Sequence, residues 1–291
     1  MLNQTFGVEI EMSGITRSEA ANVIANYFGT TSYYEGGGYD TYRVTDPQGR
    51  VWKCVYDSSI KATTHSRKCE LVTPILLYRD MNDLQEIVRL LRSAGAKSSP
   101  DFCCGIHVHI GALNYRVKYI KNIINFMSSY QDLIYKAVNV NPSRENYCRK
   151  LNPTLIENFN KRSVSNEYEC EKVWYNREDT QYCKSQHYNQ TRYHGVNLHS
   201  LFSKGTIEFR VFNGTLHAGK IRAYIVMCLA ICHYARTKSR VTKEKKQQFN
   251  DKYTMYELLC RLGVKGPEFK ACRDHLTENL IGGLGHEDRY I

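Results

Sequence analysis

Residues 5–12 read TFGVEIEM, a stretch in which apolar and acidic side chains alternate. Successive side chains of a β-strand point to opposite faces of a sheet, so this pattern predicts a strand over Thr5–Met12. Glu9 and Glu11 then share one face, and the side chains between them form an apolar face. A strand with one buried face and one face of paired acids is the starting point for both the fold and the site.

Two later stretches repeat this arrangement. Residues 105–111 read GIHVHIG and residues 206–212 read TIEFRVF, and the same rule gives each strand one apolar and one polar face. The polar faces carry His107 and His109 on the first strand, and Thr206, Glu208 and Arg210 on the second. We therefore expect three strands of one antiparallel sheet, each with an ionisable face.

Glu70 opens a fourth short strand, Cys69–Thr73, which stops at Pro74. For any single strand the structural alternative is a sheet with one face in water, since half-exposed sheets alternate in the same way. If the acids instead converge, two unit charges about 4 Å apart cost about 4 kcal/mol at an effective dielectric of about 20. A cluster of three or four acids therefore needs cations.

The residue types on these faces favour a magnesium or manganese site over a zinc site. Carboxylate oxygens predominate, with one imidazole, and this donor set suits Mg²⁺ or Mn²⁺. Arg210 follows Glu208 by two residues and would stand beside the metals, where a guanidinium can bind a phosphoryl group through two contacts. The chain has no P-loop and no Gly-x-Gly-x-x-Gly motif, so we expect any ATP to bind on the sheet.

The remaining sequence predicts helices and hairpins around these strands. Thr16 and Glu19 form a capping box that opens a helix ending near Phe28. Asp46-Pro47-Gln48-Gly49 has the residue order of a tight turn. Further expected elements are strands Tyr39–Thr45 and Arg50–Tyr56 around that turn, helices from Leu84 to Gly95, Val117 to Val138 and Ala218 to Tyr234, a hairpin of Gly195–Phe202 with Thr206–Phe212, and a helix opening with Thr254-x-x-Glu257.

Residues 139–192 differ from the rest, because they are polar, rich in tyrosine and asparagine, and without a sustained period. They predict an inserted subregion of loops around a site, with few regular elements. A lysine-rich linker, Lys238–Lys246, precedes a small helical piece. We expect a catalytic domain over residues 1–237 and a C-terminal helical extension over residues 238–291.

Composition limits the class of protein and its partners. The 291 residues include 40 Lys and Arg against 29 Asp and Glu, and the net charge of +11 favours an anionic partner. The longest apolar run, Ala223–Cys232, is shorter than the about 18 residues of a membrane span, and the N-terminus lacks the apolar region of a signal peptide. The 11 cysteines include no Cys-x-x-Cys pair. We expect reduced thiols, a cytoplasmic location and no membrane partner; the oligomeric state stays open.

Between about Phe6 and Met227, a series of short motifs resembles the amidoligase family, relatives of glutamine synthetase and γ-glutamylcysteine synthetase in the carboxylate-amine ligase superfamily. The motifs are Phe6-Gly-Val-Glu-Ile-Glu11, Asp57-Ser-Ser-Ile60, Glu70-Leu-Val-Thr-Pro74, Cys104-Gly-Ile-His-Val-His109, Ser143-Arg144 with Tyr147-Cys148, Asn197 in Gly195-Val-Asn-Leu, and Thr206-Ile-Glu-Phe-Arg210 with Gly214-Thr215. Each motif is weak alone, and their order makes the resemblance specific.

The resemblance implies an α+β fold, in which a curved antiparallel sheet forms a glutamine synthetase-like half-barrel with helices on its convex face. It implies ATP and Mg²⁺ or Mn²⁺ as cofactors. The implied reaction joins a small-molecule or peptide carboxylate to an amine: the carboxylate takes the γ-phosphate to form an acyl phosphate, and the amine displaces phosphate.

The resemblance also implies roles for single residues. The implied metal ligands are Glu9, Glu11, Glu70, His109 and Glu208. The implied catalytic residues are Glu9, Glu208, Arg210 and Asp57, with Arg210 as the γ-phosphate clamp and Asp57 as the group that binds or deprotonates the amine. The implied nucleotide or substrate contacts are Arg210, Arg144 and Asn197. The family usually has Asp-Gly-Ser where this chain has Asp57-Ser58-Ser59, and His107 has a structural alternative as a hydrogen-bond partner of His109 or the backbone.

Other interpretations stay open at this level. An ATP-dependent phosphotransferase on the same fold would make a stable phosphorylated product and no amide. A basic nucleic-acid-binding protein on a degenerate ligase scaffold would use the net positive charge and the lysine-rich linker. A cysteine nucleophile at Cys103 or Cys104 and a zinc hydrolase using His107 and His109 are the other enzymatic alternatives.

Overall fold

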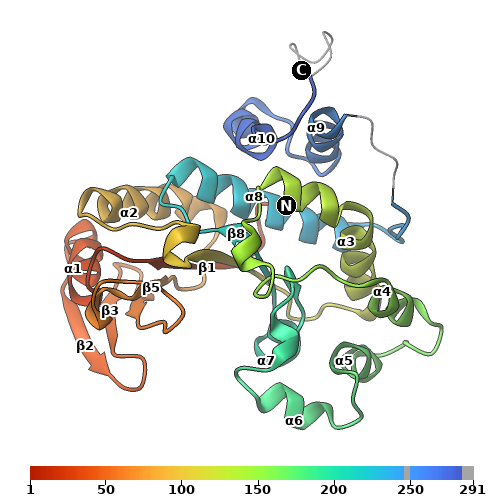
Figure 1. Ribbon diagram of the computed structural model, residues 1–291, viewed down its shortest axis with the longest axis horizontal. Coiled ribbons are helices and arrows are strands. Elements are labelled where there is room, and N and C mark those ends of the chain that lie inside the picture. Colours follow the sequence, from red (N-terminus) through yellow and green to blue (C-terminus); the bar gives the residue numbers. More distant parts are fainter. Residues whose placement is uncertain (246–249, 284–291) are drawn as a thin grey trace.

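A curved, unclosed sheet of eight antiparallel strands forms the centre of the molecule (Figure 1). The structure, a computed structural model, describes residues 1–245 and 250–283. Within them the strands are β1 (Phe6–Met12), β2 (Ser32–Gly36), β3 (Thr41–Thr45), β4 (Val51–Val55), β5 (Cys69–Val72), β6 (Gly105–Gly111), β7 (Val196–Asn197) and β8 (Thr206–Asn213). Their order is β2-β3-β4-β5-β1-β6-β8-β7, so the strands with paired acids and histidines are consecutive neighbours.

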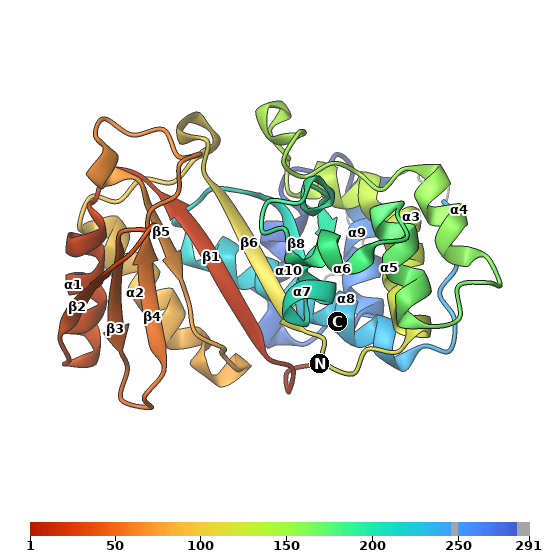
Figure 2. The same cartoon turned by 90° about the horizontal axis from the view of Figure 1, so that it is seen from below.

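Most helices pack on the apolar face of this sheet, and a few short ones border the opposite face, which carries the site (Figures 1 and 2). The helices are α1 (Arg17–Phe28), α2 (Met81–Ser93), α3 (Val117–Ala137), α4 (Pro153–Asn160), α5 (Glu167–Tyr175), α6 (Thr180–Ser185), α7 (His199–Lys204), α8 (Ala218–Thr237), α9 (Asp251–Arg261) and α10 (Lys270–Thr277). Figure 2 shows α2 and α8 behind the strands, and α3 and α10 pack in turn against α8.

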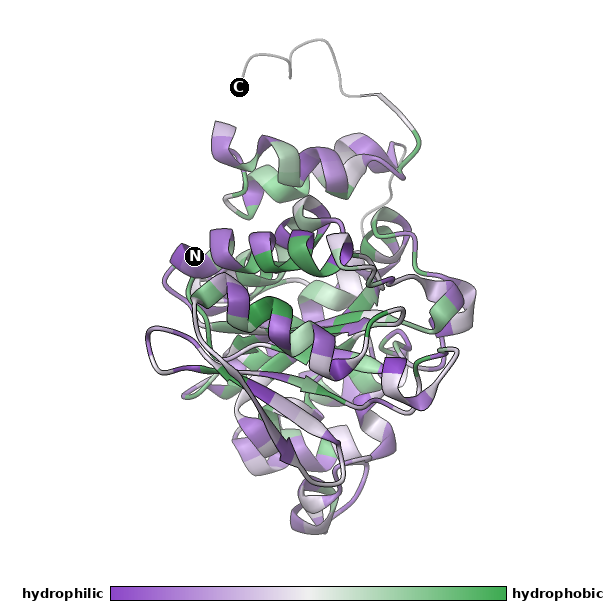
Figure 3. Ribbon diagram, turned by 90° about the vertical axis from the view of Figure 1, so that its left-hand side faces the viewer, coloured by the Kyte–Doolittle hydropathy of each residue, from purple (hydrophilic) through white to green (hydrophobic). Residues whose placement is uncertain are grey.

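The core lies between the sheet and these helices. The predicted apolar side chains of β1 and β6, such as Ile10 and Val108, are fully buried, and so is the stripe of α2 that includes Leu84 and Leu91. Hydrophobic residues accordingly concentrate in the interior in Figure 3, whereas the outward-facing parts of the helices are hydrophilic. Burial of these side chains, each worth about 1.5–3 kcal/mol, fixes which face of each strand is left for polar groups.

Local signals place several elements where the sequence predicts them. Thr16 caps α1 through the capping box with Glu19, and Gly29 ends the helix in the left-handed conformation. Strands β3 and β4 pair with Thr45 opposite Val51, which confirms the hairpin around the Asp46–Gly49 turn. Together with the sheet, these elements confirm a mixed fold with a curved antiparallel sheet; its kinship with glutamine synthetase stays a prediction.

The predicted hairpin of Gly195–Phe202 with Thr206–Phe212 is only partly right. Its first arm pairs with β8 over Val196 and Asn197 alone, and residues 199–204 form α7. The amide of Asn197 explains the change, since its oxygen accepts from the backbone N–H of His199 and turns the chain into the helix.

A bulge in β8 also breaks the alternation predicted for residues 206–212. Ile106 lies opposite Phe212 and Val108 lies opposite Phe209, so two residues of β8 face His107. Strict alternation would place Val211 opposite Ile106. Because of the bulge, Phe212 lies there instead.

The insert contains more regular structure than the sequence predicts. Three short helices, α4, α5 and α6, occur within residues 139–192. Asn152, Asn166 and Asp179 cap them by accepting hydrogen bonds from backbone N–H groups three residues ahead. Helices this short contain too few apolar residues to show a helical period in the sequence. Their N-cap residues are the signal that identifies them.

The lysine-rich segment after α8 is bound to the body of the protein as far as residue 245. Asn122 of α3 donates to the carbonyl of Lys238 and accepts from the N–H of Val241, and Ser128 donates to the carbonyl of Lys243. Residues 246–249 and 284–291 of the predicted linker and extension lie outside the described residues. Helix α9 begins at Asp251, capped by Asn250, so the predicted start at Thr254 is wrong.

All 11 cysteines are free, in agreement with the expected thiols. Among the described residues, no helix combines the length and the apolar character that crossing a membrane would require.

Candidate active site

Strand register brings the predicted acids and histidines together on the face turned away from α2 and α8. Glu9 of β1 lies opposite His107 of β6, and on the other side Glu11 lies opposite Glu70 of β5. His109 of β6 in turn lies opposite Glu208 of β8. Side chains at directly opposed positions share a face, so four consecutive strands supply one cluster.

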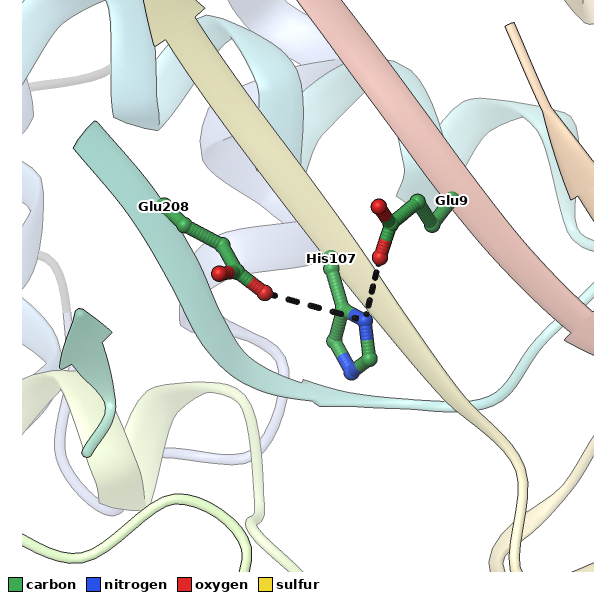
Figure 4. Close-up of side chains that lie close together, drawn as sticks. All are labelled: Glu9, His107 and Glu208. Carbon is green, nitrogen blue, oxygen red and sulfur yellow. Dashed lines mark hydrogen bonds and ion pairs between the residues drawn. The ribbon is translucent and has the colours of Figure 1, made fainter. Parts of the chain in front are cut away.

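The first group of candidate metal ligands consists of Glu9, His107 and Glu208. They offer ligand atoms within 4.8 Å of one another. His107 Nδ1 lies 2.9 Å from Glu9 Oε2 and 3.9 Å from Glu208 Oε1, and Figure 4 shows both carboxylates turned toward the ring. Two carboxylates and one imidazole from three strands thus surround one point.

The second group consists of Glu11, Glu70 and the same histidine, again with ligand atoms within 4.8 Å. His107 Nε2 lies 3.7 Å from Glu11 Oε1. The backbone N–H of Gly105 donates to the other oxygen, Oε2, at 2.6 Å, which holds the carboxylate of Glu11 in place. His107 therefore lies between two carboxylate groups, with one ring nitrogen toward each.

His109 adds a second imidazole beside the first group. Its Nε2 is buried without a hydrogen-bond partner among the described residues, and it lies 3.3 Å from Glu9 Oε1 and 3.9 Å from Glu208 Oε1. Its Nδ1 lies 3.1 Å from the hydroxyl of Thr206, which fixes the ring. A histidine that ligates a metal usually has one ring nitrogen facing the other ligands and the second held by a hydrogen bond. His109 has this arrangement, with Nε2 toward the carboxylates and Nδ1 toward Thr206.

The carboxylates respond differently to this crowding. Burial raises the pKa of Glu70 well above its ordinary value, and the charges of Glu9 and Glu11 raise it further. Burial would also raise the pKa of Glu9, but the two histidines hold it well below the usual range. Glu208 is likewise buried, yet Arg210 and then His109 lower its pKa to about 2. The raised pKa of Glu70 indicates that the cluster holds too little positive charge for all of its acids. A divalent cation would supply that charge.

Arg210 joins the cluster from β8. Its Nη1 pairs with Glu208 Oε1 at 2.5 Å, and its Nε donates to the carbonyl of Tyr147 at 3.4 Å. The guanidinium lies over the ring of Tyr193, 5.9 Å from its centroid. Although burial disfavours the charge, Glu208 and Glu9 raise the pKa of Arg210, so the charge is permanent.

A cavity of about 610 Å³, called the main cavity below, opens over this cluster. Its wall includes Glu9, Glu11, Glu70, His107, Asp57, Arg144, Arg210 and, from the loops and the insert, Tyr39, Tyr147, His187, Tyr188, Arg192, Tyr193 and Lys204. The hydroxyl of Tyr39 lies 3.1 Å from that of Tyr188, so the loop before β3 meets the insert across the opening.

Asp57 and Arg144 both line the main cavity, as the implied roles require, while Asn197 does not appear in its wall. Arg144 is buried, donates to the carbonyl of Arg210, and keeps a buried Nε with no partner among the described residues. It lies so close to Gly105 that a Cβ there would collide with the guanidinium. The amide of Asn197 donates to Glu208 Oε2 at 2.6 Å, so its nearest partner is a candidate ligand.

The residues present fit one or two hard divalent cations. Four carboxylates and two imidazoles converge, and the orphaned Nε2 of His109 is the donor that a cation would satisfy. Glu9, His107, His109 and Glu208 would hold one ion, and Glu11 and Glu70 would hold a second beside His107.

Pattern alone left some of these residues unassigned. His107 shares the face of His109, and its place between two acids depends on register, which the strand pattern does not fix. Tyr39, Arg192 and Lys204 come from loops and a helix end, where no period exists; only the insert's position suggested a wall of the site.

Sequence similarity places the chain in a known family. No curated protein matches the sequence of the chain. The family model described as "Putative amidoligase enzyme" matches residues 2–232, a span that includes every strand and every candidate ligand described above. The chain therefore belongs to this amidoligase family, a family described as ligases.

Proposed function

We propose that the protein is an ATP-dependent carboxylate-amine ligase that uses Mg²⁺ or Mn²⁺. The observation that carries the proposal is the convergence of four carboxylates, two imidazoles and the buried Arg210. All of these groups except His109 and Glu208 line the main cavity. Carboxylates with imidazoles favour a hard cation, and a permanent guanidinium beside them favours a phosphoryl group. Membership of the amidoligase family supplies the class of bond that is made.

The proposed reaction has two steps. An oxygen of the substrate carboxylate attacks the γ-phosphorus of ATP, the bond to the β-phosphate oxygen breaks, and ADP leaves. The nitrogen of a neutral amine then attacks the acyl carbon, the bond to the phosphate oxygen breaks, and orthophosphate leaves as the amide loses a proton. The first step is needed because a carboxylate has no leaving group that an amine can displace.

The chain's own residues bind and orient in this scheme. Arg210, fixed by Glu208 and by the carbonyl of Tyr147, presents its remaining donors to the transferred phosphoryl group. Asp57, which accepts from the backbone and side chain of Ser59, binds the ammonium form of the amine and takes its proton. When bound, divalent ions would neutralise phosphate charge and hold the reactants in line.

Isotope transfer tests the proposal without knowledge of the substrate. A pool of amino acids and short peptides labelled with ¹⁸O in the carboxylates is incubated with enzyme, MgATP and a pool of amines. The proposal predicts one ¹⁸O in the orthophosphate released, ADP in equal amount, and a new amide mass. Glu9→Gln is the matched inactive control.

The outcomes separate the main alternatives. Labelled phosphate with an amide product supports the ligase. A stable phosphorylated product without amide would instead indicate a phosphotransferase. Release of AMP and pyrophosphate would contradict transfer of the γ-phosphate.

A further inference from the structure

A second, smaller cavity shares wall residues with the main cavity and has no role in the scheme above. This side pocket measures about 180 Å³. Its wall consists of Lys184, Ser185, His187, Arg192, Asn197, His199, Ser200, Ser203, Lys204 and Glu208. His187, Arg192 and Lys204 line both it and the main cavity, so these three residues stand where the two spaces join.

Arg192 and Lys204, the two cations at this junction, have no carboxylate partner of the kind that Arg210 has in Glu208. Four basic side chains lie in the wall of the main cavity, and of these Arg210 pairs with a carboxylate. Within residues 1–245 and 250–283 no ion pair involves Arg144, Arg192 or Lys204, and only the last two also line the side pocket. Basic groups that remain unpaired next to a cluster of acids are available to a ligand. An anion is the ligand that satisfies them.

Arg192 is held in place at the junction by contacts that leave most of its donors free. Its Nη1 donates to the carbonyl of His187 at 3.0 Å, and its guanidinium lies over the rings of Tyr188 and Tyr193. A guanidinium has five N–H donors, so the stacking fixes the plane while several donors stay unused.

Lys204 approaches the same point from another element. It is the last residue of α7, and Gly205 ends the helix in the left-handed conformation. His187, Arg192 and Lys204 line both cavities, and burial together with these two charges lowers the pKa of His187. Two cations from separate elements therefore converge on one small space.

We propose that Arg192 and Lys204 form a binding site for a tetrahedral phosphate group at the junction of the main cavity and the side pocket. Its occupant is the terminal phosphate of ATP before transfer, or the orthophosphate released afterwards, which would leave through the side pocket. This inference rests on the proposed ligase function. It adds two further cations to Arg210 at the phosphate site.

Calorimetric titration of the purified full chain in Mg²⁺ tests the site. The probes are ATP, ADP, and orthophosphate added to protein saturated with ADP. For Lys204→Gln and Arg192→Gln we expect the affinity for ATP to fall about 10-fold to 100-fold, and the affinity for ADP to change less than about 2-fold. Lys265→Gln, at an exposed lysine of the C-terminal piece, is the matched control and should bind all three as wild type does.

Each result decides something. Weaker ATP binding with unchanged orthophosphate binding assigns the site to the nucleotide, and loss of orthophosphate binding assigns it to the product as well. An equal loss of affinity for ADP and ATP would show that the two cations contact the inner phosphates, and it would overturn the proposal. Wild-type affinities in both variants would overturn it as well. If the wild-type protein itself binds no ATP, the ligase function fails first. Lys204 is exposed at a helix end, so its variant should melt as wild type does.

Discussion

Glu70 shows most clearly the cost of gathering acids in one hollow. Burial and the neighbouring carboxylates raise its pKa above the ordinary 4.5. A folded-state pKa above the unfolded value gives stability that is present at low pH and is lost as the pH rises through the folded value. The metal-free protein should therefore lose thermal stability as the pH rises from that ordinary value.

Glu70→Gln should remove this pH dependence in part. We expect the metal-free variant to melt at a higher temperature than wild type at neutral pH, because one repelling charge is gone. Mg²⁺ should then stabilise the variant less than it stabilises wild type. Melting temperatures across the pH range, with Mg²⁺ and with chelator, measure both effects. Identical curves for the two proteins would show that Glu70 is not crowded.

Arg210→Lys tests whether a planar, permanently charged group is needed. An ammonium cannot pair with Glu208 and reach the carbonyl of Tyr147 in the same geometry, so ATP turnover should fall by about 100-fold. ADP release under saturating ATP measures it. Arg43→Lys, in the exposed pair with Glu35, is the control and should keep full turnover. Turnover within about 2-fold of wild type would dismiss the clamp.

At the residue scale the sequence was informative wherever a strand carried the group. Glu9, Glu11, His109, Glu208 and Arg210 follow from alternation, because a period of two fixes the face. The pairing of His107 with two sets of acids depends on which strands are neighbours, and one strand's pattern does not contain that information.

At the scale of elements, the β3–β4 hairpin depends on one buried carboxylate. Asp46 accepts hydrogen bonds from the backbone of Gln48 and Arg50, the side chain of Arg50 and the indole of Trp52. Burial would raise its pKa, but these donors hold it below the ordinary value. This contribution to stability is present above the unfolded pKa of about 3.8 and is lost as the pH falls below it.

Asp46→Asn should destabilise the protein by about 2–3 kcal/mol, because an amide N–H₂ would face donors where an oxygen accepted. Urea denaturation at neutral pH measures the loss. The difference from wild type should shrink in acid, where the wild-type carboxylate is itself protonated. Asp101→Asn, at an exposed position, is the control. An unchanged midpoint in Asp46→Asn would show that the turn holds without this carboxylate.

Elements were predictable where a cap or turn combined with a hydrophobic period. The helix after Thr16 and the hairpin around Asp46 have both signals, and both occur as predicted. The insert's helices have caps without a period, and α7 arises because Asn197 bonds the backbone ahead of it. Edge strand β2 was missed, since its alternation is obscured by exposed tyrosines and a bulge before Gly36.

At the scale of the whole molecule, the segment after α8 joins the C-terminal helices to the body. Asn122 is buried on α3 and bonds the carbonyls of Ala235 and Lys238 and the N–H of Val241. Asn122→Ala should release this segment, and amide exchange at Val241 should accelerate by about 10-fold or more. Hydrogen-exchange mass spectrometry of the peptide measures it, with exposed Asn22→Ala as control. Unchanged protection would show that the bonds to Asn122 do not hold the segment.

The proposed function depends on the four-strand cluster being a metal site. The most direct measurement is an anomalous difference map from a crystal of the protein grown with Mn²⁺ and a non-hydrolysable ATP analogue. We predict manganese peaks at coordination distance, about 2.1–2.3 Å, from carboxylate oxygens of Glu9 and Glu208, and from those of Glu11 and Glu70 if a second ion binds. A well-ordered cluster without any manganese peak at saturating Mn²⁺ would contradict it.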